Sequence, residues 1–285
     1  MTLKEVFVKS ITSKFQKALE RRGLRLIRNQ VHHELLSDLR IAQTKLKWTD
    51  MNEFPALGEY IKSEISHSNM VSQLQQDFVA KFFHSLNSNK PGFFVEFGAS
   101  DGIVFSNTLL LEQRYSWTGI IAEPAKSWQD SLKKNRKCRI DFRCVWSESG
   151  KLIEFNETTS AEYSTISHFS EGDLHEEVRR SGRKYSVETV SLIDLLDHHG
   201  APNVISYLSV DTEGSEYEIL EHFDFSKYSF NFISVEHNYG VNRGNLKALL
   251  EGNGYSQVLQ RYSEFDDWFI HDSALVSFKK GGSIA

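Results

Sequence analysis

The sequence predicts an α/β fold, in which a mostly parallel sheet covered by helices on both faces follows a helical N-terminal extension. Two observations lead to this prediction. After Gly92, short apolar runs of strand length alternate with segments of helical periodicity. The chain also has 285 residues, of which 40% are hydrophobic and 25% charged, an ordinary composition for a soluble protein with one large domain.

Residues 1–90 form the predicted extension. Its first helix, 3–22, carries an apolar residue at every fourth position, namely Leu3, Phe7, Ile11, Phe15 and Leu19. Gly23 is its expected end, and residues 31–47 and 69–87 are further predicted helices. The loop-forming run from Asn87 to Gly92 marks the boundary to the main domain, 91–285.

The main domain is expected to alternate strands and helices. The predicted strands are 93–97, 118–122, 140–145, 205–210, 230–235, 255–260 and 268–278, and the helices are 108–114, 127–135, 191–199, 215–221 and 246–251. Ser191 is the expected N-cap of its helix, and Gly252 ends the last one. Residues 151–190 interrupt the alternation with a polar stretch, and we expect this insertion to lie over the ligand crevice.

Charge is distributed unevenly along the chain. Residues 1–30 carry a net charge of +6 and the whole chain carries −5, so the remaining residues carry −11. An acidic body has no general affinity for nucleic acid, and no aromatic platform supports nucleic-acid binding by the basic first helix. That helix is expected to pack on its own domain or on a partner subunit of a homodimer. Peripheral docking on an anionic membrane is the alternative.

Several classes of protein are excluded. No stretch approaches the ~18 consecutive apolar residues of a transmembrane helix, and the N-terminus lacks the apolar core of a signal peptide. The two cysteines, Cys138 and Cys144, cannot form a disulfide framework or a cysteine-rich zinc site, and Cys144 is expected in the core. The sequence therefore predicts a cytoplasmic protein, peripheral at the inner membrane surface if the basic helix docks there.

The turn after the first predicted strand carries two carboxylates, Glu96 and Asp101. In a doubly wound sheet this turn lies at the topological switch point, where ligands bind. Gly98 and Gly102 let the backbone approach a ligand closely. The carboxylates disfavour a phosphate and favour a cationic or neutral ligand. The alternative is an ordinary strand–turn–helix connection with capping residues.

Acidic and aromatic residues end the next two strands. Glu123, followed by Pro124, ends the second, and from this position a carboxylate accepts hydrogen bonds from both hydroxyls of a ribose. Val145 and Trp146 end the third.

Together these residues resemble the class I S-adenosylmethionine-dependent methyltransferases, whose acidic glycine loop reads (D/E)-x-G-x-x-x-G. Glu96 to Gly102 match this pattern at each position. The resemblance implies a Rossmann-like, seven-stranded sheet and a bound S-adenosylmethionine, with adenine at the end of the third strand. There, Trp146 either stacks on the base or packs beneath the insertion. The implied cofactor contacts are Glu96, Gly98, Ala99, Asp101, Gly102, Ser106, Glu123, Pro124, Val145, Trp146 and Asp211.

A second segment resembles one particular family within this class. Residues 207–220 read Tyr-Leu-Ser-Val-Asp-Thr-Glu-Gly-Ser-Glu-Tyr-Glu-Ile-Leu, which resembles the signature of the FkbM methyltransferases: an apolar strand, Asp-x-Glu-Gly-x-Glu, and a helix. The resemblance extends from about Phe93 to Phe278. The family often has a lysine two residues before this aspartate, where the chain has Ser209, so the acidic cluster loses a neighbouring cation.

Methyl transfer to an alcohol requires removal of the hydroxyl proton, by a general base or by a metal ion that acidifies the hydroxyl. Asp211 ends the fourth strand, and Glu236, His237 and Asn238 end the fifth, ~5 Å away in a parallel sheet. These four residues are a candidate site for Mg²⁺ or Mn²⁺. A metal-free mechanism with Asp211 or His237 as base stays open, and Glu213 is a further candidate catalytic residue.

Structural roles compete for several of these residues. Glu213 and Glu216 can serve the N-terminus of the following helix, where carboxylates are stabilised. His237 can instead be a packed histidine under the insertion. The segment Asp266–Trp268 either reaches the acceptor pocket or forms a solvated turn.

The residues and the resemblance together predict S-adenosylmethionine-dependent methyl transfer to an oxygen. The family implies O-methylation and an acceptor hydroxyl on a sugar of a glycan, glycolipid or natural product. The insertion and the N-terminal helices are expected to frame the acceptor site. The alternatives are a lipid or small phenolic acceptor, or a non-catalytic binding protein with the same fold.

Overall fold

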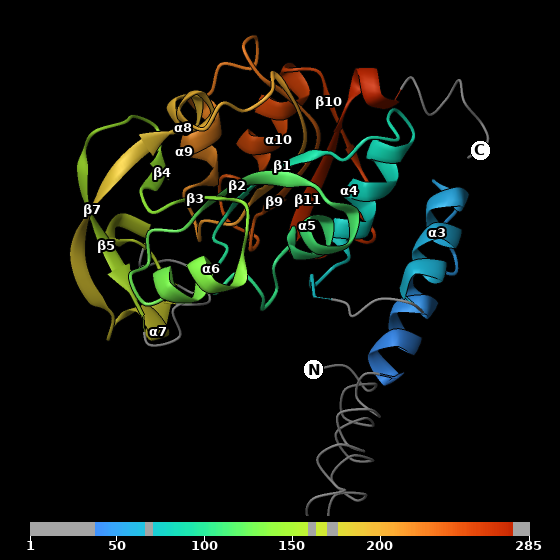
Figure 1. Ribbon diagram of the computed structural model, residues 1–285, viewed down its shortest axis with the longest axis horizontal. Coiled ribbons are helices and arrows are strands. Elements are labelled where there is room, and N and C mark those ends of the chain that lie inside the picture. Colours follow the sequence, from blue (N-terminus) through green and yellow to red (C-terminus); the bar gives the residue numbers. More distant parts are fainter. Residues whose placement is uncertain (1–37, 66–70, 159–163, 170–175, 276–285) are drawn as a thin grey trace, which may run out of the picture. The chain divides into compact units, whose positions relative to one another are not determined.

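The computed structural model describes residues 38–65, 71–158, 164–169 and 176–275, which are coloured in Figure 1. The chain divides into two compact units, residues 1–68 and 69–285. In the first, residues 38–47 are helical, as predicted, and α3 spans Pro55–Ile65, which the sequence pattern did not indicate. Gly58 of α3 lies against Met51 and the carbonyl of Trp48, so the preceding turn packs tightly on this helix. The predicted helix 3–22 lies outside the described residues.

The second unit begins before the predicted main domain. Its first helix, α4, spans Gln76–Ser85 and packs on strands of the main sheet. The Phe83 ring lies 5.9 Å from that of Phe232 in the sheet. The division at residue 68 therefore precedes the boundary near residue 91 that the sequence suggests, because the apolar stripe of α4 covers one sheet face.

The main sheet has seven strands in the order β10-β11-β9-β8-β1-β2-β3. Their bounds are β1 Phe93–Phe97, β2 Thr118–Ala122, β3 Arg139–Asp141, β8 Val204–Val210, β9 Ser229–Glu236, β10 Tyr255–Val258 and β11 Asp266–His271. The pairs are parallel except for those that involve β11. This confirms the predicted Rossmann-like architecture. The last strand ends at His271 rather than at Phe278, and residues 272–275 are helical.

The predicted strand 140–145 is wrong as a single element. The main chain turns after Asp141, whose carboxylate accepts hydrogen bonds from the Arg143 backbone N–H and guanidinium at 2.9 and 3.0 Å. β4, Cys144–Trp146, then pairs with β7 in a second sheet of order β4-β7-β5-β6.

The insertion builds most of that second sheet. It contributes β5 Leu152–Glu157, β6 Thr165–Ile166, η2 Ser167–Phe169, α7 Glu176–Arg179 and β7 Arg183–Ser191. Figure 1 shows these elements beside the main sheet, in green to yellow. The polar stretch is therefore an ordered subdomain over the described part of 151–190.

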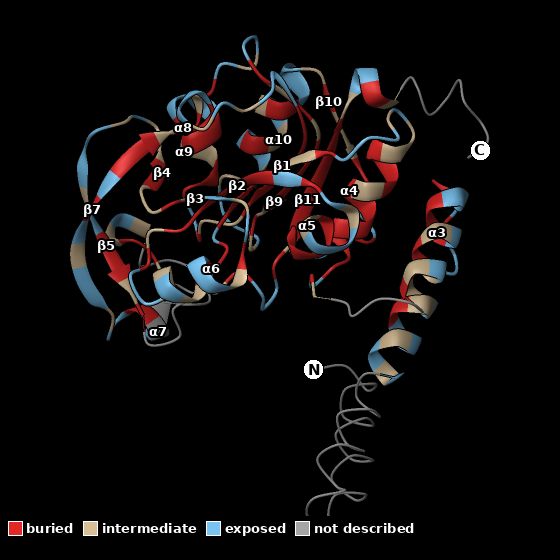
Figure 2. Ribbon diagram, in the orientation of Figure 1, coloured by how far each residue is buried: buried red, intermediate tan, exposed pale blue. Residues whose placement is uncertain are grey.

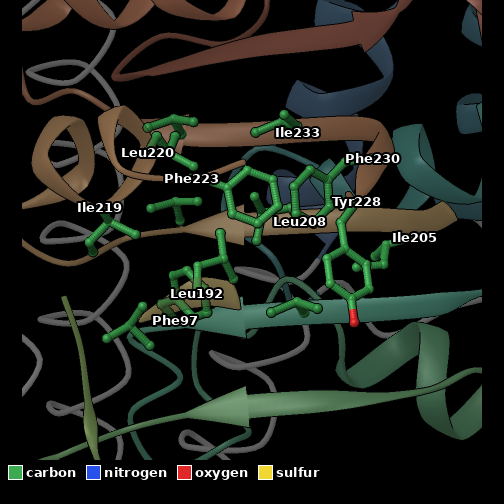
Figure 3. Close-up of a cluster of buried hydrophobic side chains, with 14 of the residues drawn as sticks. Phe97, Leu192, Ile205, Leu208, Ile219, Leu220, Phe223, Tyr228, Phe230 and Ile233 are labelled. Atoms are coloured by element: carbon green, nitrogen blue, oxygen red, sulfur yellow. The ribbon is translucent and has the colours of Figure 1, made fainter. Parts of the chain in front are cut away.

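Helices cover both faces of the main sheet, as predicted. They are α5 Leu109–Tyr115, α6 Gln129–Asn135, α8 Leu192–His198, α9 Glu216–Glu221 and α10 Arg243–Gly252. Figure 3 shows Leu208 and Ile233 of the sheet packed against Ile219 and Leu220 of α9. On the opposite face Tyr207 stacks on Phe232, and α4 packs there. The strands are buried while the outer helix faces are exposed (Figure 2).

The topology places one set of strand ends together. β1, β2, β8 and β9 are parallel, so Phe97, Ala122, Val210 and Glu236 end at the same edge of the sheet. Among the described residues, no helix has the length and hydropathy required to cross a bilayer.

Candidate active site

Gly98 lets the loops after β1 and β8 touch. Its φ is 74°, and a Cβ at this position would overlap the carbonyl oxygen of Asp211. A side chain would therefore push the two loops apart and distort the edge where the strands end.

We expect Gly98→Ala to lower the free energy of unfolding by about 1 to 3 kcal/mol more than Gly150→Ala. Gly150 is the matched control, because its φ is 76° and nothing lies within 4 Å of an added Cβ. Both substitutions place a side chain at a similar left-handed φ, and only the first creates a clash. Urea titration measures both, and equal losses would show that the contact with Asp211 relaxes freely.

Glu96 organises the start of α5. Its buried carboxylate accepts hydrogen bonds from the Asn107 backbone N–H at 2.7 Å and from the Ser106 hydroxyl at 3.2 Å. Arg136 lies 3.4 Å away, and its own side chain is fully buried. Arg136 thus supplies a buried cation beside Glu96, and no sequence pattern indicated it.

The rest of the glycine loop is held by its own contacts. The Asp101 carboxylate accepts hydrogen bonds from the backbone N–H groups of Ile103 and Val104, both at 2.8 Å. The Gly102 N–H donates to the Ala99 carbonyl at 2.8 Å. Ala99, Asp101 and Gly102 shape the loop and line neither of the two cavities that open beside it.

The first of these, the β2 cavity, is lined by Glu123, Pro124, Val145, Phe155, Ile166 and Asp211, among others. Glu123 accepts hydrogen bonds from the backbone N–H groups of Ser100 at 3.0 Å and Ala125 at 2.9 Å. Burial raises the pKa of its carboxyl to about 7, and the charges of Asp211 and Glu157 add to this effect. Glu123 and Val145 therefore lie where the sequence predicted them.

The insertion supplies part of the β2 cavity. Phe155 and Ile166 contribute its apolar wall, which sequence reasoning missed. Trp146 does not line the cavity, and its ring packs edge-on against Phe169 at 5.9 Å. Of the two alternatives, Trp146 therefore packs beneath the insertion.

The second cavity, the β8 cavity, is strongly acidic. Its lining includes the carboxylates of Glu96, Asp211, Glu213, Glu236 and Asp266, together with Ser106, Asn107 and Ser209. None of the described residues that line it is Lys or Arg. Asn107 donates to the Ser209 hydroxyl at 3.0 Å, which leaves its buried carbonyl oxygen without a hydrogen-bond partner. The two cavities share Gly98, Asp211 and Glu213.

Three carboxylates meet at this junction. Oxygens of Asp211, Glu213 and Glu236 lie within 4.8 Å of one another. Burial, and then the charge of Asp211, holds the pKa of Glu236 well above its usual range. Glu213 has a φ of 57° and pairs with the fully buried Arg179 of α7 at 2.7 Å. The insertion is therefore tied directly to the predicted catalytic loop.

His237 does not join this group, which corrects the predicted metal set. His237 lies just after the end of β9, and its ring is held by other partners. Its Nδ1 accepts the Tyr239 backbone N–H at 2.9 Å, and its Nε2 lies 3.7 Å from the Asp267 carboxylate. Asn238 follows in a left-handed conformation, with a φ of 38°, and lines neither the β2 cavity nor the β8 cavity. Burial lowers the pKa of His237.

Glu216 has the structural role considered for it. One of its carboxylate oxygens accepts hydrogen bonds from the Thr212 and Gly214 backbone N–H groups, both at 3.0 Å. It therefore fixes the turn that presents Asp211 and Glu213.

Asp266 and Asp267 are not a solvated turn, because both are buried. Asp266 accepts hydrogen bonds from Gln76 at 2.9 Å and from the Trp268 indole at 3.1 Å, and it lines the β8 cavity. Asp267 pairs with Arg243 at 2.8 Å. The helix α4 thus contributes to the site through Gln76.

Two solved structures are similar in outline. One is a precorrin-6y C5,15-methyltransferase from Geobacter metallireducens, at 12% identity and a TM-score of 0.34, over 68% of this chain and 86% of that one. The other is the plantazolicin methyltransferase BpumL in complex with SAH, at 10% identity and a TM-score of 0.29, over 86% of this chain and 76% of that one. At identities and TM-scores this low, neither residue roles nor reactions are carried over from these proteins to this chain. No curated protein matches the chain.

The family comparison is more informative. Residues 96–269, more than half of the chain, match the methyltransferase FkbM domain. The matched range runs from Glu96 through the Asp211–Glu216 turn to Phe269, and so contains both loops that form the cavities. The chain is therefore a methyltransferase of the FkbM family.

Proposed function

We propose that the two cavities together bind S-adenosylmethionine and that the enzyme methylates a hydroxyl oxygen, on a sugar of a glycan, glycolipid or natural product. The observation that carries this proposal is the continuity of the cavities across Gly98. The β2 cavity offers Glu123 to the ribose hydroxyls and an apolar wall to adenine. The β8 cavity offers carboxylates to the ammonium and sulfonium groups, with no Lys or Arg among its described lining residues.

In this proposal, the β8 cavity binds the methionine end of the cofactor. The unpartnered carbonyl oxygen of Asn107 is suited to accept a hydrogen bond from the cofactor's ammonium group. Because the Asn107 side chain is held by Ser209, this acceptor is in place before the ligand arrives.

We expect Asn107→Ala to weaken S-adenosylhomocysteine binding about tenfold or more, the size of one hydrogen bond to a charged group. Binding of 5′-methylthioadenosine, which lacks the amino acid chain, is the internal control and should not change. Calorimetric titration of both ligands measures the difference. An equal loss for both ligands would place Asn107 elsewhere in the cofactor site.

The cofactor supplies an activated methyl group, and the protein positions the acceptor in line with it. A bond forms between the acceptor oxygen and the methyl carbon while the sulfur–carbon bond breaks, and sulfur keeps the electron pair. The hydroxyl proton passes to a carboxylate at the junction of the cavities. Asp211 is better placed for this role than His237, whose two ring nitrogens face Tyr239 and Asp267. Burial holds the pKa of Glu236 well above its usual range and so favours its protonated form, which cannot act as the base.

The same carboxylates fit a divalent cation. Asp211, Glu213 and Glu236 offer oxygen ligands, and one buried oxygen of Glu236 has no hydrogen-bond partner. Oxygen ligands favour Mg²⁺ or Mn²⁺, and such an ion would acidify the acceptor hydroxyl. Turnover that survives exhaustive chelation would reject the cation and assign the proton to a carboxylate alone.

A mass-spectrometric screen of methyl acceptors with the full chain and S-adenosylmethionine tests the proposal. We expect a mass gain of one methyl group on a hydroxyl-bearing sugar. Methylation only of lipids or phenols would replace the acceptor class. Cofactor binding without any transfer would support a non-catalytic binding protein.

A further inference from the structure

A third cavity, which we call the outer cleft, opens beside the carboxylate junction. It is lined by Phe169, Glu213, Tyr217, Glu236, His237 and Arg243, among others. Glu213 and Glu236 also line the β8 cavity, so the two spaces meet at these carboxylates. A ligand in the outer cleft would therefore have one end beside the methionine end of the cofactor.

The charges around the outer cleft are largely satisfied by the protein itself. Glu213 pairs with Arg179, and Arg243 makes two hydrogen bonds to Asp267, each at 2.8 Å. Glu216, which also lines the cleft, is bonded to backbone N–H groups of its own turn. An anionic ligand would meet carboxylates and no unpaired Lys or Arg among the described lining residues. A neutral ligand with hydroxyl donors can instead approach the Glu236 carboxyl, which lines the cleft.

Aromatic side chains provide the apolar part of the outer cleft. Phe169 lies against the backbone of Gly214, where an added Cβ would be 3.2 Å from the Phe169 Cβ. Tyr217 is fixed by a 2.8 Å hydrogen bond from its hydroxyl to Glu221. Val241, on the rim, is 98% exposed. Ligand sites of this kind combine fixed aromatic faces with a few oriented polar groups.

We infer that the outer cleft binds the methyl acceptor as a neutral pyranoside ring. The apolar face of the ring lies on Tyr217, and one hydroxyl points to Glu236. Phosphorylated or carboxylated sugars are excluded by charge. This inference rests on the proposed function, since it places the acceptor relative to the cofactor.

The test uses the full chain, with and without S-adenosylhomocysteine, and saturation-transfer NMR. The neutral probes are the methyl α-pyranosides of glucose, mannose, galactose and rhamnose at millimolar concentration, and the anionic probe is glucose 1-phosphate. We expect at least one neutral probe to bind and glucose 1-phosphate not to bind. Tyr217→Ala should weaken the neutral probe about tenfold. It should leave S-adenosylhomocysteine affinity unchanged, because Tyr217 lines neither cofactor cavity.

Tyr239→Ala is the matched control, because Tyr239 is 68% exposed and lies next to the outer cleft without lining it. The inference is overturned if no neutral probe binds, if Tyr217→Ala and Tyr239→Ala have the same effect, or if glucose 1-phosphate binds more tightly. Absence of S-adenosylhomocysteine binding would instead defeat the proposed cofactor site, and the probes without cofactor would still report on the cleft.

Discussion

Replacing Arg179 with methionine is expected to lower the free energy of unfolding by about 3 to 5 kcal/mol, because it leaves the buried Glu213 carboxylate without its cation. The Arg179 guanidinium also donates to the Phe169 carbonyl at 3.2 Å, so the same change releases η2 from its position over the catalytic loop. Urea titration followed by tryptophan fluorescence measures the loss.

Lys184→Met is the control on the same insertion. Lys184 pairs with Glu154 at 3.0 Å, but both side chains are more than half exposed, so we expect a much smaller loss than for Arg179→Met. The double variant Arg179→Met/Glu213→Gln should recover part of the stability, since it removes both charges together. A loss for Arg179→Met as small as that for Lys184→Met would show that the pair does not anchor the insertion.

Replacing Glu123 with glutamine is expected to weaken S-adenosylhomocysteine binding by about ten- to a hundredfold, the value of hydrogen bonds to a charged acceptor. The wild-type affinity should also rise as the pH increases through about 7, because the ionised carboxylate accepts both ribose hydroxyls. The variant has no group to ionise at this position, so its affinity should change little over the same range. Calorimetry between pH 6 and pH 8, as approximate limits around that pKa, measures both effects.

The same substitution should change the pH dependence of stability. Burial raises the pKa of Glu123 from 4.5 to about 7 in the folded protein, so folding favours its protonated form. The raised pKa therefore stabilises the wild type at low pH. Its free energy of unfolding should fall by about 2 to 3 kcal/mol as the pH rises from roughly 5 to 8. Over that range Glu123→Gln should become more stable relative to the wild type. A constant difference between the two proteins would mean that Glu123 is ionised throughout.

Periodicity was sufficient to predict the main sheet, because its strands are buried on both faces and read as continuous apolar runs. It failed at residues 140–145, where the apolar pattern continues across the turn. The turn itself is local, through the Asp141 carboxylate and its bonds to Arg143. The strand after it leaves the main sheet because Cys144 pairs with Thr189 of β7, a contact between residues far apart in the sequence. The insertion was also underestimated, because β5 and β7 pair antiparallel with many polar residues on their exposed face.

The site residues that could be predicted are those at strand ends, and the ones that were missed depend on partners distant in the sequence. Glu123 and Asp211 were placed correctly because their position at strand ends fixes their edge of the sheet. His237 was assigned to the metal set because it follows Glu236 directly, but its ring nitrogens lie beside Tyr239 and Asp267 instead. Arg136, Arg179 and Asn107 act through partners at least ten residues away, and no spacing rule indicates such contacts.

The central claim is that the cavities on either side of Gly98 form one site for S-adenosylmethionine. Isothermal titration of the full chain with S-adenosylmethionine tests it most directly. The account predicts one cofactor per chain with a micromolar dissociation constant, and a clear loss of affinity in Glu123→Gln. No binding at high micromolar cofactor, or binding that Glu123→Gln leaves unchanged, would contradict it.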